Sequence, residues 1–139
     1  MMTFAELFRE GQKSKSLDNG ELARSKAKEL LSSHGITLKT DLTPISLEAG
    51  AVVGIAFYSL PDLKFLDQLV LACRDKKLGN SVIVFDVLSC KTMTDFEKLI
   101  PGVGSVYQTP VVGIWRDGEL VETGIGAKGR MLVVGKGKS

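Results

Sequence analysis

The chain has 139 residues, of which 44% are hydrophobic and 24% are charged, and its formal net charge is +2 at pH 7. This length suits one domain with its own core, and so small a net charge gives no electrostatic case for binding nucleic acid or a membrane surface. The two cysteines form no zinc or disulfide pattern, no apolar run approaches the roughly 18 residues of a membrane span, and the N-terminus lacks the basic start of a signal peptide. We therefore expect a cytoplasmic protein without a metal or a cofactor.

The chain begins with an amphipathic segment. Residues 4–10 place Phe4, Leu7 and Phe8 on one face of a short predicted helix, and residues 11–16 are polar enough for a loop. This apolar face needs a surface to cover it. It can pack on other helices of the same chain, or it can be offered to a partner or to a second copy of the chain.

A longer helix and a first strand are predicted next. Asp18 and Glu21 have capping-box spacing, so we expect a helix over about residues 19–34. Gly35 can end this helix, because glycine readily adopts the positive φ of a helix C-cap. Residues 36–40 then alternate weakly in hydropathy, as a strand does.

The middle of the chain predicts two buried strands. Residues 43–50 carry Pro44 at a possible first-turn position and are expected to form a short helix. Residues 51–58 form a nearly continuous apolar run, which is typical of a strand buried on both faces. A helix over about residues 59–78 and a second buried strand over residues 81–88 follow.

The last part of the chain predicts a hairpin. Thr94 and Glu97 have capping-box spacing for a short helix. Pro110 then precedes an apolar strand, which is where a residue without an N–H group fits a sheet. Asp117-Gly118 lies between two apolar runs and is a strong signal for a two-residue turn.

A strand over residues 120–123 and a short helix over residues 124–134 complete the predicted order. Strand–helix–strand connections give parallel strand pairs, and the hairpin adds an antiparallel pair. The sequence therefore predicts an α/β fold of three α/β/α layers with a mixed central sheet.

This order, together with several motifs, resembles the thioredoxin-like family from about residue 36 to residue 134. An aromatic pair ends the first core strand, a Val-x-x-Thr-Pro turn precedes a later strand, and a hairpin follows. These motifs are Phe57-Tyr58, Val106-x-x-Thr109-Pro110 and Ile114-Trp115-Arg116-Asp117-Gly118-Glu119. The resemblance implies a thioredoxin-like domain over residues 36–139, a cis proline in the Thr-Pro turn, and a helical extension over residues 1–35.

The chain departs from the family where redox-active members carry Cys-x-x-Cys. The tetrapeptide at that position is Ser59-Leu60-Pro61-Asp62, which holds no cysteine. Thiol–disulfide exchange requires a thiolate nucleophile, so dithiol oxidoreductase activity is not expected. Two interpretations of Ser59 remain open: it can help to bind an anion at the helix N-terminus, or Ser59 and Asp62 can simply cap the helix.

Three other residues carry reactive groups. Cys73 falls on the apolar stripe of its helix, roughly 20 Å from the helix start at 1.5 Å per residue, and is expected to be a buried hydrophobe. Cys90 follows the second core strand, at the edge where open α/β sheets bind ligands, and is either an ordinary loop residue or a redox or nucleophilic cysteine. His34 lies in a last helical turn without a second histidine, which disfavours a metal site.

These observations give one main hypothesis and two alternatives. The main hypothesis is a redox-inactive thioredoxin-fold protein that binds a protein or peptide through a groove around the Thr-Pro turn. By resemblance, the groove would consist of Tyr58, Ser59, Leu60, Pro61, Asp62, Cys90, Thr109 and Pro110. The first alternative is a thiol-dependent enzyme or sensor that uses Cys90 alone, and the second is an assembly component that forms a homo-oligomer through its N-terminal helices.

Overall fold

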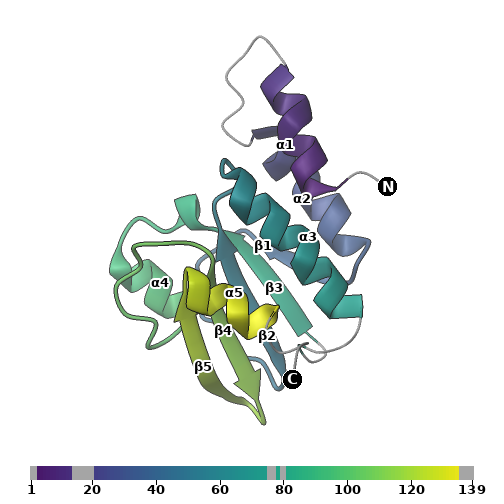
Figure 1. Ribbon diagram of the computed structural model, residues 1–139. Coiled ribbons are helices and arrows are strands. Elements are labelled where there is room, and N and C mark those ends of the chain that lie inside the picture. The colour runs from purple at the N-terminus through teal and green to yellow at the C-terminus, as the bar shows by residue number, and fades with distance from the viewer. Residues whose placement is uncertain (1–2, 14–20, 75–77, 79–80, 135–139) are drawn as a thin grey trace.

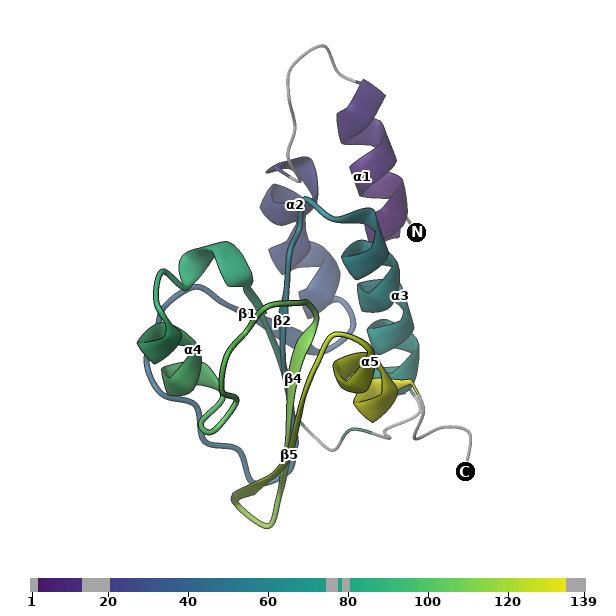
Figure 2. The same cartoon turned by 60° about the vertical axis from the view of Figure 1, so that its left-hand side comes forward.

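A computed structural model describes residues 3–13, 21–74, 78 and 81–134 of the chain. The elements follow in the order α1 (Phe4–Lys13), α2 (Glu21–Ser32), β1 (Ile36–Lys39), β2 (Gly50–Ile55), α3 (Leu60–Arg74), β3 (Ser81–Asp86), a 3₁₀ turn η1 (Val87–Ser89), α4 (Met93–Leu99), β4 (Val111–Arg116), β5 (Glu119–Ile125) and α5 (Ala127–Val133). Helices α1, α2, α3 and α5 lie on one side of the sheet and α4 on the other (Figure 2). The predicted mixed α/β fold is confirmed, and its layers are compatible with an α/β/α arrangement.

The five strands form one sheet in the order β1-β3-β2-β4-β5 (Figure 1). Strands β1 and β2 both run parallel to β3, whereas β2 pairs antiparallel with β4 and β4 antiparallel with β5. In this register Val53 of β2 lies beside Val84 of β3 and Val112 of β4. The predicted origin of the mixed sheet is confirmed, since a helical crossover joins β2 to parallel β3 and a hairpin joins β4 to antiparallel β5.

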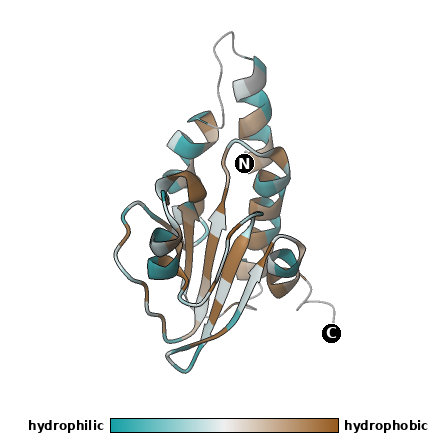
Figure 3. Ribbon diagram, turned by 90° about the vertical axis from the view of Figure 1, so that its left-hand side faces the viewer, coloured by the Kyte–Doolittle hydropathy of each residue, from teal (hydrophilic) through white to brown (hydrophobic). Residues whose placement is uncertain are grey.

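Strand β2 is the centre of the fold because both of its faces are buried. Val53 and Ile55 belong to the core under α2, α3 and α5, whereas Val52 belongs to a second core under α4. The two-sided burial predicted from the apolar run is confirmed, although the strand ends at Ile55 rather than at residue 58. The brown strands between the two helical layers in Figure 3 show the same pattern. Gly54 has no room for a side chain, because a Cβ there would lie 2.3 Å from Cζ of Phe85.

The apolar face of α1 packs within the chain. Phe4 and Leu7 are buried in the same core as α2, α3 and the sheet, and Phe8 packs against that core while half-buried. Asp67 on α3 fixes the start of α1, because its carboxylate accepts hydrogen bonds from the N–H groups of Phe4 (3.0 Å) and Ala5 (3.3 Å). Helix α1 also continues to Lys13, so the predicted loop over residues 11–16 begins later than expected.

The ends of the following helices agree with the sequence where they can be compared. Helix α2 ends at Ser32, slightly before the expected residue 34. Gly35, in the turn that follows, has the positive φ expected of it (76°) and donates its N–H to the carbonyl of Ser32. Asp18, the first residue of the predicted capping box, lies outside the described residues. The predicted end of the next helix includes residues 75–77, which also lie outside them.

The helix expected over residues 43–50 is wrong. Asp41 accepts hydrogen bonds from the N–H of Thr43 (3.0 Å) and from its hydroxyl, and Lys39 Nζ lies 2.7 Å from the same carboxylate oxygen. This local turn competes with a helical start, and the segment instead runs irregularly along the sheet. Its Glu48 carbonyl accepts the N–H of Gly118 at the tip of the β4–β5 hairpin.

That hairpin tip confirms the predicted Asp117-Gly118 turn. Asp117 has a φ of 51° and Gly118 a φ of 78°, the two positive values that a two-residue turn of type I′ needs. Strand β3 is shorter than the expected 81–88. It ends at Asp86, whose side chain accepts the N–H of Leu88 and starts η1.

The capping residue of α4 is Thr92, and the predicted Thr94–Glu97 box is wrong. Thr92 Oγ1 accepts the N–H of Asp95 (3.4 Å), and the Asp95 carboxylate accepts the N–H of Thr92 (3.3 Å) in return. The helix starts here rather than at Thr94 because the Asp95 carboxylate also accepts the N–H of Lys91 at 2.8 Å. Glu97 is used beyond the helix, where its carboxylate accepts the N–H of Gly102 (2.7 Å).

Candidate functional site

The topology brings the predicted groove segments to one edge of the sheet, which we call the Pro110 edge. Tyr58 and Ser59 follow β2, and Cys90 follows β3, which runs parallel to β2. Thr109 and Pro110 immediately precede β4, which runs antiparallel to β2 and therefore starts where β2 ends. The edge is the upper one in Figure 1, where α3 begins.

The peptide bond between Thr109 and Pro110 is cis, which agrees with the expectation from the resemblance. Pro110 is buried and its carbonyl accepts the N–H of Gly126 at 2.9 Å. Gly129 of α5 packs directly on this turn, since a Cβ there would lie 2.8 Å from the Pro110 carbonyl oxygen. The start of α5 therefore packs on the Pro110 side of the turn, and Thr109 stays half-buried at the edge.

The segment before the turn has an unused backbone. Residues 105–109 belong to no helix or strand, and within the described part of the chain their N–H and C=O groups make no hydrogen bond. Tyr107, in the middle of this segment, is 77% exposed. Three further large apolar side chains on loops or the helix start at the same edge are also exposed: Tyr58, Leu88 and Met93.

Asp62 is turned into the protein, although the sequence suggested that it could cap α3 together with Ser59. Its side chain is only 2% exposed, and Oδ2 accepts the N–H of Ala56 at 2.8 Å. Oδ1 lies 3.7 Å from Nη2 of Arg130 on α5. The carboxylate thus ties the end of β2 to α3 and α5. It also places negative charge in the first turn of α3, which does not favour an anion at that helix end.

A pocket of about 330 Å³ lies beside this carboxylate, between α3 and α5. Two predicted groove residues, Leu60 and Pro61, line it. The others are Lys64, Phe65, Gln68 and Arg130, which sequence reasoning did not select. Arg130 Nε is buried and has no hydrogen-bond partner among the described residues. No local pattern could have identified Arg130, because its contact with Asp62 depends on how α5 packs on α3.

The two cysteines lie on opposite faces of the sheet. Cys73 packs against the core under α3, where burial raises the pKa of its thiol to about 11. Cys90 is half-buried against the core under α4 and donates its N–H to the carbonyl of Val87. This separation agrees with the expectation that they form no disulfide, and both thiols are free.

The surroundings of Cys90 do not favour a reactive thiol. Burial is the largest influence and raises the pKa of the Cys90 thiol, and the carboxylates of Asp95 and Asp86 raise it further, although a hydrogen bond with Ser89 lowers it. An activated cysteine has the opposite setting, with a nearby cation or helix N-terminus that stabilises the thiolate. The single-cysteine alternative therefore gains no support from this geometry.

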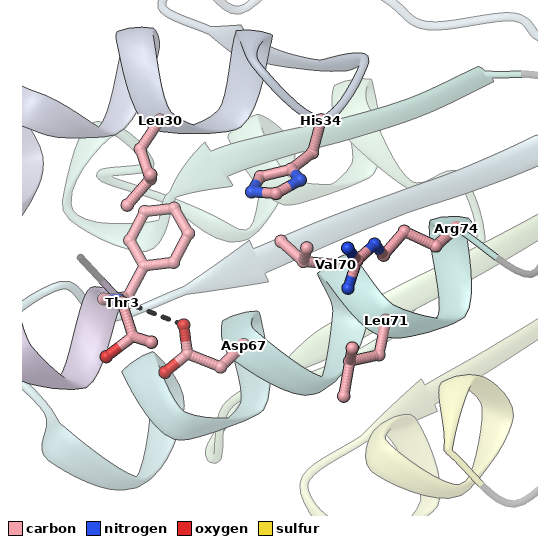
Figure 4. A pocket seen from close by; sticks show the side chains of 8 residues that line it. Thr3, Leu30, His34, Asp67, Val70, Leu71 and Arg74 are labelled. Carbon is pink, nitrogen blue, oxygen red and sulfur yellow. Dashed lines mark hydrogen bonds between the residues drawn. The ribbon is translucent and has the colours of Figure 1, made fainter. Parts of the chain in front are cut away.

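A second cavity, which we call the α1–α3 cavity, lies on the helical side of the sheet. Its volume is about 350 Å³, and it is a partly open pocket lined by residues from the start of α1, the end of α2 and the second half of α3 (Figure 4). His34 lines this cavity, a position that sequence reasoning did not anticipate. In the described residues, no group of three or more histidine, cysteine or acidic side chains is placed to hold a metal ion.

Among the described helices, none has both the length and the apolar character needed to cross a membrane. No model of a known protein family, no curated protein and no solved structure matched the chain.

Proposed function

We propose that this protein has a thioredoxin-like fold without dithiol chemistry, and that it binds an extended peptide or a loop of a partner protein at the Pro110 edge. The observation that carries the proposal is the backbone of residues 105–109, which leads into the cis turn and makes no hydrogen bond with the rest of the described chain. An extended peptide can add to such a segment as a strand, because main-chain hydrogen bonds supply affinity without requiring one particular sequence.

The thioredoxin-like part of the proposal is supported by three features together. The strand order β1-β3-β2-β4-β5 combines parallel and antiparallel pairs, the Thr109–Pro110 bond is cis, and α3 begins directly after β2. In thioredoxins the Thr-Pro turn offers its backbone to an extended peptide, and this interaction does not require the cysteines.

Side chains around the edge suit the same kind of ligand. Tyr107, Tyr58, Leu88 and Met93 are all exposed and lie on segments that meet at this edge. Large apolar side chains that gather on one part of a surface mark interaction sites more often than isolated ones do. They would contact alternate side chains of a bound peptide, whose backbone pairs with residues 105–109.

Selection from a displayed library of random peptides would test this function. We expect peptides that are enriched by the intact chain and not by Thr109→Arg, in which a long charged side chain occupies the turn. Titration of an enriched peptide should then show at least a tenfold loss of affinity in Tyr107→Ala, since exposed aromatic anchors carry much of the energy of such interfaces.

The matched control is Val121→Ala, which truncates another exposed apolar side chain, on β5. It should leave the affinity unchanged. If the library yields no peptide that discriminates the intact chain from Thr109→Arg, or if Tyr107→Ala binds as tightly as the original chain, the proposed function is wrong.

A further inference from the structure

The α1–α3 cavity has the size and position of a small-molecule site separate from the Pro110 edge. Its volume of about 350 Å³ falls at the lower end of the range for ligand pockets. It opens between three helices, with Phe4 contributed by α1 and Val70 by α3. A compact ligand rather than a protein segment fits this volume.

Apolar side chains form most of the cavity wall, with Thr3 and Asp67 at the Phe4 end and two basic groups at the other end. Phe4 lines this cavity, and Figure 4 shows Thr3 and Leu30 towards one end and the imidazole of His34 and the guanidinium of Arg74 towards the other. Val70 lies between the two ends, and Leu71, which is 55% exposed, stands at the rim. An apolar wall that ends in a cation is the pattern that an amphipathic anion requires.

The basic groups of the cavity are not engaged by the protein. Across the described ranges, the side chains of His34 and Arg74 make no hydrogen bond or ion pair. The one carboxylate lining the cavity, Asp67, is already bound to the N–H groups of Phe4 and Ala5 at the other end. Its negative charge opposes an anion near Phe4, and the guanidinium, which is always protonated, attracts one near Arg74.

We propose that the α1–α3 cavity binds a small monocarboxylate with an unbranched hydrocarbon tail. The carboxylate accepts hydrogen bonds from the Arg74 guanidinium, with His34 beside it, and the tail lies along Val70 towards Phe4. One guanidinium matches one carboxylate in a bidentate pair, whereas the apolar wall offers nothing to the hydration shell of an inorganic anion. The proposal does not depend on peptide binding at the Pro110 edge.

Calorimetric titration of the intact chain with octanoate tests this assignment. We expect saturable binding at one site, at least tenfold weaker binding of butanoate because most of the tail is lost, and at least tenfold weaker binding of 1-octanol and octylammonium because neither supplies an anion. Octanoate that fails to saturate, or 1-octanol that binds as tightly as octanoate, would overturn the proposal.

Two pairs of variants locate the site. Arg74→Gln should weaken octanoate at least tenfold, and Arg116→Gln, at an exposed arginine on β4, should not change its affinity. Leu71→Asp puts a negative charge at the rim and should abolish binding, whereas the same change at Met131, which is exposed on α5, should not. Unchanged binding in both Arg74→Gln and Leu71→Asp would show that octanoate binds elsewhere and would refute the assignment.

Discussion

Replacing Asp62 tests how the start of α3 is held. In Asp62→Ala the N–H of Ala56, a residue that is 2% exposed, loses its acceptor at 2.8 Å. A buried donor left without a partner costs about 1–3 kcal/mol, and a hydrogen bond to a charged acceptor contributes about 1.5–3 kcal/mol. These figures describe overlapping effects, so we expect the free energy of unfolding to fall by about 2–4 kcal/mol.

The contact between Asp62 and Arg130 contributes much less of this loss. The two charged groups are 3.7 Å apart, and the Arg130 side chain is 43% exposed, so water solvates the guanidinium when its partner is removed. Partly exposed ion pairs of this kind contribute roughly 0–1 kcal/mol. We therefore expect Arg130→Ala to destabilise the protein by less than about 1 kcal/mol, and Asp62→Asn, which keeps one acceptor oxygen, to fall between the two alanine variants.

Urea unfolding at constant pH measures these differences as shifts of the midpoint at an unchanged m-value. The predicted order of stability is the original chain, Arg130→Ala, Asp62→Asn and Asp62→Ala. An Asp62→Ala variant within about 0.5 kcal/mol of the original chain would refute the assignment of Asp62 as the buried acceptor for Ala56. Equal losses in Arg130→Ala and Asp62→Ala would show that the ion pair dominates instead.

Two further predictions concern ionisable groups. Burial raises the pKa of Asp67 above its ordinary value of 3.8, so protonation of this carboxyl favours the folded state. The free energy of unfolding of the original chain, relative to that of Asp67→Asn, should therefore fall as the pH rises through and above 3.8. A difference that grows with pH in urea titrations would contradict this sign. Burial likewise raises the pKa of the Cys90 thiol above 9.0. In a Cys73→Ser background, the rate of Cys90 alkylation by iodoacetamide should be lower at pH 7 than that of a free thiol, and this rate should keep rising beyond pH 9. A rate that levels off near neutral pH would restore the single-cysteine alternative.

The elements that the sequence predicted best are those whose signals are local. The apolar run of β2 and the Asp117-Gly118 turn depend on residues next to one another, and both have the expected structure. Helix caps were less certain because several residues compete for the same N–H groups. Thr92 caps α4 rather than Thr94, since Asp95 binds backward to two N–H groups at once.

The candidate site was predictable as an edge but not as a set of contacts. The order of the elements placed Cys90 at the edge where the parallel strands end, and only the resemblance brought Ser59, Thr109 and Pro110 to the same edge. They could not show that Asp62 points inward or that Arg130 faces it, because that pair joins helices far apart in the sequence. The α1–α3 cavity could not be predicted for the same reason, since Phe4, His34 and Arg74 come together only when three helices pack.

If the fold is thioredoxin-like, as proposed, the difference from redox-active members at Ser59-Leu60-Pro61-Asp62 involves more than the replacement of two cysteines. The position of the second cysteine in the family holds a carboxylate whose two oxygens contact Ala56 and Arg130. A thiol at this place is a weak acceptor and cannot take over both contacts. Introducing Cys-x-x-Cys would therefore leave the N–H of Ala56 poorly paired and remove a link between β2, α3 and α5. The start of α3 in this chain is built around a buried carboxylate, and its packing does not suit dithiol chemistry.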